Sequence, residues 1–167
     1  LRNKPFEILP DFIQGGLMDA ADYNDGNGKI KVRARITAED KTTAVITEVP
    51  FGSTTESLIS SIEDAAKKGK IKIKSIEDYT SEKVEIQVKL NAGVDVDQAI
   101  QALYAFTECE SSVSCRMIVI KDNRPVEMSV SSALRHQTQR LVDILEQELK
   151  LQQQKALEEL HLKTLVQ

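Results

Sequence analysis

The sequence predicts an α+β fold, in which a split βαβ (ferredoxin-like) sheet with two helices on one face precedes a long C-terminal coiled-coil helix. The first observation is the order strand, helix, strand, strand, helix, strand, which hydrophobic periodicity indicates for residues 42–120. The second is the change after Pro125, because residues 129–167 contain neither Pro nor Gly and are rich in good helix formers. We therefore expect three parts: residues 1–41, 42–128 and 129–167.

The N-terminal part is predicted to be irregular up to residue 28, because prolines, glycines and turn residues interrupt every period there. These interruptions are Pro5, Pro10, Gly15, Gly16 and the run at residues 24–28. Residues 29–36 then alternate without a fault between charged and apolar side chains, which predicts a strand with two chemically distinct faces. A second strand over residues 42–49 is rich in Thr and Val and stops at Pro50.

Two helices and three further strands are expected in the middle part. Each helix has a candidate N-cap: Ser53 or Thr54 for the first and Asp95 or Asp97 for the second. The first helix is predicted to end near Gly69, the position where a glycine often follows a helix. The three strands are expected over residues 70–76, 83–90 and 113–120.

The C-terminal part is predicted to be one helix, from about residue 129 to residue 167, more than roughly 50 Å long at about 1.5 Å per residue. Its apolar side chains keep to one stripe: Leu134, Leu141, Leu145, Leu149, Ala156 and Leu160. A small domain cannot cover a stripe of this length, so the helix needs a partner helix. The missing partner, together with a first residue that is not Met, suggests a piece of a longer protein.

Charge is unevenly distributed over the 167 residues. The 22 Lys plus Arg and 26 Asp plus Glu give a formal net charge of −4, which for the chain as a whole argues against nucleic-acid binding. Residues 28–36 and 67–74, however, carry nine cations and no acid, and the remaining 13 bases and 26 acids leave −13 elsewhere. The molecule is therefore expected to be polarised.

The first basic segment places four like charges on one strand face, where they repel one another and favour an anionic partner. Alternate residues lie about 6.6 Å apart, comparable with the phosphate spacing along a DNA strand. No aromatic or base-reading pattern accompanies them, so the contacts would go to the DNA backbone and would not depend on the DNA sequence. The candidate DNA-binding residues are Lys29, Lys31, Arg33 and Arg35, with Lys70, Lys72 and Lys74 as secondary candidates. The alternative is a solvated face whose lysines protect a sheet edge from aggregation.

The sequence offers little for catalysis or for a metal. It contains no GxSxG, P-loop, dinucleotide-binding or HExxH motif. Cys109 and Cys115 do not have the spacing of metal ligands, and neither histidine lies beside a second plausible ligand. No apolar run approaches the roughly 18 residues of a membrane helix. We expect no catalytic residue, metal site or cofactor within this chain, and reduced cysteines.

Several motifs resemble the A subunits of bacterial type IIA DNA topoisomerases, in the same order along essentially the whole chain. Pro10-Asp11-Phe12 with Gly15-Gly16 resembles their PGPDFPTGG segment, and residues 23–35 resemble their Y-x-T-G-R-G-K…R-A-R strand. Residues 47–51 match HEIPY, and residues 103–125 match NLYSQT…NMVAL…GQP. Arg135-His136 with Arg140 is similar to the RHRR start of the long helix.

The resemblance implies the tower domain and the start of the coiled-coil arm of the DNA breakage-rejoining subunit, in an ATP-dependent isomerase. The residue choices at Met18-Asp19-Ala20 and Tyr23-Asn24-Asp25 resemble the A subunit of topoisomerase IV of the Bacteroides type more closely than that of gyrase. Asn27 stands where the family has the Arg of GRG, and Gln14 replaces the Thr of PT. The sequence therefore departs from the family near Asn27, where the resemblance implies a contact to the DNA backbone.

The resemblance also implies a bacterial, cytoplasmic, chromosome-associated protein, without membrane, that acts on double-stranded DNA as an A2B2 heterotetramer. The tower grips the arms of the bent gate segment, and Mg2+ and ATP are bound through the B subunit. The nucleophilic tyrosine of the family lies N-terminal to this region, and none of Tyr23, Tyr79 and Tyr104 matches its motif.

Two other classes of function remain open. In the first, the chain is a protein-interaction module in which the long helix is the active part and the basic face makes no DNA contact. In the second, it is a small ligand-binding regulator, which requires a polar pocket between sheet and helices.

Overall fold

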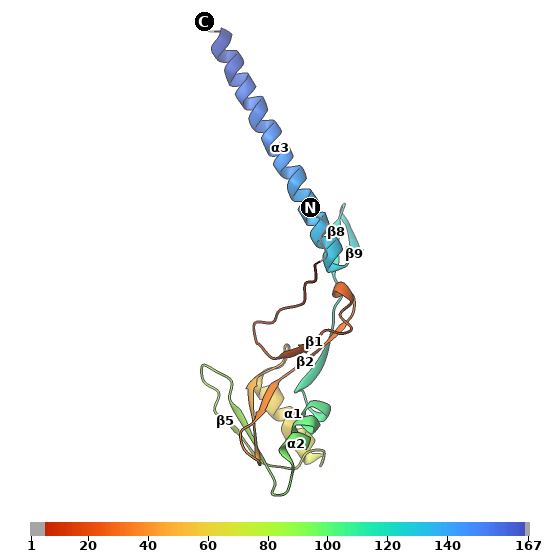
Figure 1. Cartoon of the computed structure of the whole chain (residues 1–167), viewed down its shortest axis with the longest axis vertical. Coiled ribbons are helices and arrows are strands. Elements are labelled where there is room, and N and C mark those ends of the chain that lie inside the picture. The colour runs from red at the N-terminus through yellow and green to blue at the C-terminus, as the bar shows by residue number, and fades with distance from the viewer. Residues whose placement is uncertain (1–5, 166–167) are drawn as a thin grey trace. The chain divides into compact units, whose positions relative to one another are not determined.

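The computed structural model describes residues 6–165, and Figure 1 labels its main elements. The strands are β1 (Leu17–Asp19), β2 (Lys29–Arg33), β3 (Arg35–Ala38), β4 (Thr43–Glu48), β5 (Ile73–Asp78), β6 (Ile86–Leu90), β7 (Glu110–Ser114), β8 (Ile118–Lys121) and β9 (Arg124–Glu127). The helices are α1 (Thr55–Lys67), α2 (Val96–Phe106) and α3 (Val130–Leu165), with a short 3-10 turn at Asn24–Gly26. The predicted α+β class and the long C-terminal helix are confirmed. The predictions for residues 1–5 and 166–167 lie outside the described residues.

The described chain divides by its contacts into two compact units, residues 9–115 and residues 116–165 with 6–8. The first unit contains a four-stranded antiparallel sheet in the order β3-β4-β6-β5. Ile46 of β4 lies opposite Ile86 of β6, and Ala44 lies opposite Val88. Opposed residues of neighbouring strands share a face, so these four apolar side chains form one side of the sheet.

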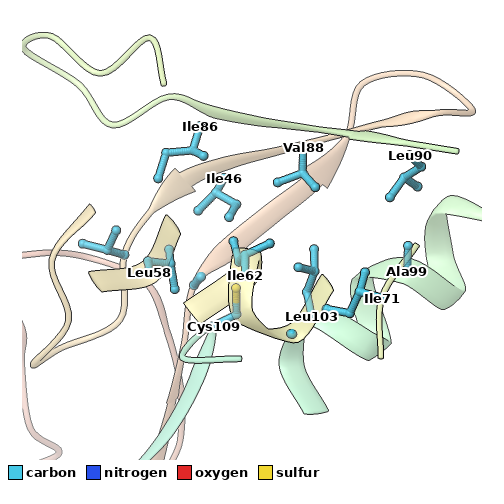
Figure 2. Packing of buried hydrophobic residues seen from close by; sticks show 13 residues of the cluster. Ile46, Leu58, Ile62, Ile71, Ile86, Val88, Leu90, Ala99, Leu103 and Cys109 are labelled. Atoms are coloured by element: carbon cyan, nitrogen blue, oxygen red, sulfur yellow. The ribbon is translucent and has the colours of Figure 1, made fainter. Parts of the chain in front are cut away.

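Both α1 and α2 pack on this apolar side, as predicted. Figure 2 shows Ile46, Ile86 and Val88 of the sheet pointing toward side chains of the helices. The helices contribute Leu58 and Ile62 from α1, and Ala99 and Leu103 from α2, all 0–3% exposed. Burying an aliphatic side chain of this size stabilises the fold by about 1.5–3 kcal/mol, so this layer holds the first unit together.

The ends of the two helices follow the predicted signals. Thr54 is the N-cap of α1, and its side chain and that of Ser57 each accept a hydrogen bond from the other residue's backbone N–H at 3.1 Å. Asp95 caps α2 by accepting from the Asp97 N–H at 3.3 Å. Gly69, with φ +72°, follows the last turn of α1 as predicted.

The strand predicted for residues 70–76 starts later, at Ile73. The reason is the way in which α1 ends: the Gly69 N–H donates to the Ala66 carbonyl and the Lys70 N–H donates to the Ala65 carbonyl, both at 2.9 Å. These two bonds form the helix-terminating arrangement that a glycine permits, and they hold Lys70 at the helix end. The strand predicted for residues 83–90 is likewise shorter and begins at Ile86.

A second sheet in the same unit, in the order β1-β2-β7, corrects two strand predictions. Residues 29–36 do not form one strand, because β2 pairs with β7 whereas β3 pairs with β4. The change of partner occurs at Ala34, whose N–H donates to the Cys109 carbonyl at 2.8 Å and whose carbonyl accepts from the Tyr104 hydroxyl at 3.0 Å. Residues 113–120 do not form one strand either. The position beside β4 that this strand would take in a split βαβ sheet is occupied by β3.

The second unit contains the β8–β9 hairpin and α3. Asp122 and Asn123, at φ +51° and +61°, form the two-residue turn of the hairpin, a conformation that Asp and Asn tolerate well. Ile118–Lys121 therefore pairs within its own hairpin and does not extend β7. No residue of α3 is buried in the described part of the chain, and its leucines, such as Leu141 and Leu149, are 57% and 64% exposed. The domain boundaries at residues 41 and 128 remain predictions.

Candidate nucleic-acid interface

The alternation of the basic segment is preserved although the strand is divided. Ile30, Val32 and Ala34 are 0–2% exposed. The four cations between and beside them are all exposed: Lys29, Lys31, Arg33 and Arg35. Period-two geometry alone produces this separation, because successive side chains of extended backbone point to opposite sides.

The division of the strand separates the four cations into two sheets. Lys29, Lys31 and Arg33 belong to β2 in the three-stranded sheet, whereas Arg35 begins β3 at an edge of the four-stranded sheet. In the three-stranded sheet β1 lies on one side of β2 and β7 on the other. Three of the four predicted residues therefore share one exposed sheet face.

Arg33 is paired with an acid. Its Nε lies 2.5 Å from Oε2 of Glu110, the residue directly opposite on β7. Its guanidinium also lies over the ring of Tyr104, 5.2 Å from the ring centroid, where the ring face attracts a cation. The charge of Arg33 is therefore largely satisfied within the chain.

Arg35 is paired in the same way, with Glu48. The Arg35 Nε lies 3.0 Å from Glu48 Oε2, and the same oxygen accepts a hydrogen bond from the Gly16 N–H at 2.5 Å. The hydrogen bond from Gly16, and secondly the one from Arg35, lower the pKa of Glu48. Glu48 thereby ties the turn before β1 to the start of β3.

Gly16 allows this close approach. Its φ is +93°, which favours glycine, and a Cβ at this position would lie 2.7 Å from the Arg33 carbonyl oxygen. The turn can therefore rest against the basic strand only because residue 16 has no side chain.

Lys29 and Lys31 differ from the two arginines. Neither makes an ion pair with any of residues 6–165. Asp19 of β1 lies opposite Lys31, but its Oδ1 accepts a hydrogen bond from the Ala21 N–H at 3.1 Å. These two ammonium groups are the cations on this face that an external anion reaches without competition from a carboxylate bound to them.

The secondary candidates lie elsewhere in the first unit. Lys70 and Lys72 are in the loop before β5, and Lys74 is at a register shift within β5, which is an edge strand. The Lys70 ammonium lies 5.4 Å from the centroid of the Phe106 ring, and Lys70 lines two surface concavities of about 450 and 470 Å³. The structure thus does not bring these lysines into one row with those of β2.

The cysteine thiols and the side chains that could bind a metal do not form a site in the described residues. Burial raises the pKa of the Cys109 thiol to about 11, and both cysteines are free thiols. Among residues 6–165 no three His, Cys, Asp or Glu side chains gather as metal ligands. Within the same range no helix is both long and apolar enough to span a bilayer.

The sequence prediction did not include Glu48, Glu110, Ser112 and Ser114, which lie around the four cations. No local pattern identifies the last three, because their proximity follows from strand pairing between distant segments. Glu48 lies in the stretch that resembles HEIPY, but that resemblance does not indicate its partner.

Comparison with known proteins now identifies the family. The family model for the A subunit of DNA gyrase and topoisomerase IV matches residues 1–167. The A subunit of DNA topoisomerase 4 from Borreliella burgdorferi is 44% identical over the whole chain, which spans 27% of that protein. The DNA gyrase A subunits of Lawsonia intracellularis and Treponema pallidum are 31% and 30% identical over 92% of the chain, which spans 20% of each. This chain belongs to the family of DNA gyrase and topoisomerase IV A subunits.

Proposed function

We propose that this chain acts as the DNA-gripping tower in the A subunit of a type IIA topoisomerase, and that the exposed face of the β1-β2-β7 sheet holds the gate-segment backbone without sequence choice. The observation that carries the proposal is the pair of exposed ammonium groups, Lys29 and Lys31, that have no acidic partner within residues 6–165. Phosphate contacts position a protein on duplex DNA and carry no sequence information themselves.

Such contacts have a purpose in a topoisomerase. Bending a duplex costs several kcal/mol, and cationic contacts on the arms that flank the bend offset that cost. The net charge of −4 does not oppose this role, because residues 28–36 and 67–74 carry nine cations and no acid, and Lys29, Lys31 and Arg33 share one exposed sheet face. Lys70, Lys72 and Lys74 are secondary contacts in the proposal. For Lys74, the edge position of β5 makes protection against aggregation the alternative.

The whole enzyme in this proposal is a bacterial, cytoplasmic, ATP-hydrolysing DNA topoisomerase, an isomerase, assembled as A2B2 without membrane attachment. Its catalytic tyrosine lies outside this chain, and Mg2+ and ATP are bound through the B subunit. The contribution of residues 9–115 is to bind and orient DNA beside the cut, and no chemical step is assigned to them.

The test is the salt dependence of DNA binding by the intact enzyme, with its A and B subunits assembled. The variant Lys29→Ala/Lys31→Ala/Arg33→Ala/Arg35→Ala is compared with the unmodified enzyme by fluorescence anisotropy on a linear duplex. Each phosphate contact adds about 0.9 to the slope of log affinity against log salt, so the slope should fall by about 1.8 from the two unpaired lysines. The two arginines, each bound to a carboxylate, should add little to this fall.

A matched variant removes four exposed cations elsewhere: Lys41, Lys83, Arg124 and Lys155. It changes the net charge by the same amount and should leave the slope nearly unchanged. Equal changes in both variants would show a general charge effect and would refute the proposed interface.

A second function, a protein-interaction module, is favoured by α3. The helix is about 54 Å long, at roughly 1.5 Å per residue, and its leucine stripe is exposed. A helix of this kind gains stability by packing on another helix. DNA binding by the same enzyme variants distinguishes the two functions. A DNA affinity and a salt slope that are unchanged in the four-cation variant would support the interaction module alone.

A further inference from the structure

Two serines of β7 lie directly beside the free lysines of β2. In the β2–β7 pairing, Ser112 is opposite Lys31 and Ser114 is opposite Lys29. Directly opposed residues of an antiparallel pair share a face and have Cβ atoms about 4.5–5.5 Å apart. Each hydroxyl group therefore lies on the same exposed sheet face as the side chain of the facing lysine.

The hydroxyl groups of both serines are available. Ser112 and Ser114 are exposed, and neither side chain hydrogen-bonds to any residue in the described range 6–165. Other serines of this unit are hydrogen-bonded: the Ser61 hydroxyl, for example, accepts a hydrogen bond from the Glu108 N–H at 2.9 Å. A serine hydroxyl is a good donor to a phosphate oxygen, and Ser contacts to DNA phosphates are common.

The opposite end of the same two strands is built differently. There Glu110 faces Arg33 and binds it, so the local charge is close to neutral and includes a carboxylate that repels phosphate. Asp19 adds a second carboxylate on the β1 side of Lys31. An anionic backbone is thus attracted to the β7 side of Lys29 and Lys31, which is where the two serines lie.

We propose that Lys29, Lys31, Ser112 and Ser114 form one phosphate-binding patch, in which each serine hydroxyl donates to a phosphate oxygen that the facing lysine also contacts. The proposal deepens the DNA-gripping function above and rests on it. It adds two contact residues from a strand that carries no cation and therefore gave no signal in the charge pattern.

The experiment compares two variants of the intact enzyme on a linear duplex over a range of salt concentrations. Lys29→Ala/Lys31→Ala should lower the salt slope by about 1.8, at about 0.9 per phosphate. Ser112→Ala/Ser114→Ala should weaken binding by roughly five-fold per hydroxyl and leave the slope unchanged, because a neutral donor releases no counterion.

Two controls make the result specific. Ser112→Thr/Ser114→Thr keeps both hydroxyl groups and should retain affinity, which separates a lost hydrogen bond from a disturbed strand. Ser60→Ala/Ser81→Ala removes two other exposed serines of the same unit and should have no effect on DNA binding.

The outcomes separate this inference from the proposed function. If the lysine variant loses slope but Ser112→Ala/Ser114→Ala binds like the unmodified enzyme, the patch is wrong and the interface stands. If neither the lysine variant nor Arg33→Ala/Arg35→Ala changes the slope, the proposed interface itself is wrong. A threonine variant as weak as the alanine variant would also overturn the role of the hydroxyl groups.

Discussion

The two halves of the basic segment, Lys29 with Lys31 and Arg33 with Arg35, share one sequence pattern but differ in their surroundings. The side chains of Arg33 and Arg35 are 45% and 46% exposed, so they are as accessible as surface residues ordinarily are. Each nevertheless holds a carboxylate within hydrogen-bonding distance, whereas the two lysines have serines as neighbours across the strand pair.

This difference teaches that exposure and charge together do not define an anion site. Exposed ion pairs contribute only about 0–1 kcal/mol to stability, but they neutralise the cation that a phosphate would need. The arginine half therefore joins structural segments, and the lysine half remains available to a ligand. Four changes to the chain can break or sharpen this contrast.

The largest effect is expected from Gly28→Ala, at the lysine end. An added Cβ would lie 1.9 Å from the Asp22 carbonyl oxygen and 2.8 Å from that of Tyr23, so backbone must move. Strain of this kind costs about 1–3 kcal/mol and occasionally more, and we expect a loss of at least about 3 kcal/mol in the free energy of unfolding. Urea denaturation measures it. Gly93→Ala, whose Cβ meets nothing within 4 Å but whose φ of +82° still disfavours alanine, should cost less and serves as the comparison.

A smaller loss is expected from Tyr104→Phe, at the arginine end. The change removes the donor to the carbonyl of the buried Ala34, where β2 gives way to β3. An unsatisfied buried carbonyl costs about 1–3 kcal/mol, and denaturation should show a loss near the lower limit because Tyr104 is half-buried. Tyr79→Phe, which removes an exposed hydroxyl bonded to Glu77, should cost less; an equal loss would contradict this account of the strand break.

Glu110→Gln tests whether the carboxylate withholds Arg33 from DNA. Without the charge of Glu110, Arg33 is free to contact a phosphate, so the salt slope of DNA binding by the enzyme should rise by up to about 0.9. Glu108→Gln, two residues away and outside any ion pair in the described chain, is the matched control. A salt slope that stays constant or falls in Glu110→Gln would show that Glu110 does not withhold Arg33 from DNA.

The smallest effect is the pH dependence of Glu48. Because its pKa is lowered in the folded chain, ionised Glu48 stabilises the fold above its ordinary value of 4.5, and this contribution disappears as the pH falls through the lowered value. The stability advantage of the unmodified chain over Glu48→Gln should therefore be present at pH 7 and shrink below about pH 4.5. A difference in melting temperature that is the same at pH 7 and pH 3 would argue against the pairing with Gly16 and Arg35.

Local features were predictable from residue patterns. The N-cap at Thr54, the glycine after α1 and the cap at Asp95 follow from short-range hydrogen bonding, and the structure confirms them. The burial of Ile30, Val32 and Ala34 follows from period-two alternation. The hairpin at Asp122 and Asn123 has an equally local cause, but the apolar run of residues 118–120 concealed it within a longer predicted strand.

The sequence by itself determined the α+β class, the long C-terminal helix, the basic face and the family, because periodicity, propensity and motif order are properties of neighbouring residues. Only the tertiary structure decided which charges are free. Arg33 and Glu110 are 77 residues apart, and the exchange of partners at Ala34 sets the register that joins them. Strand pairing between distant segments depends on the packing of the whole unit. No window of sequence therefore reveals that Lys29 and Lys31 face serines of β7, whereas Arg33 faces Glu110 and Arg35 faces Glu48.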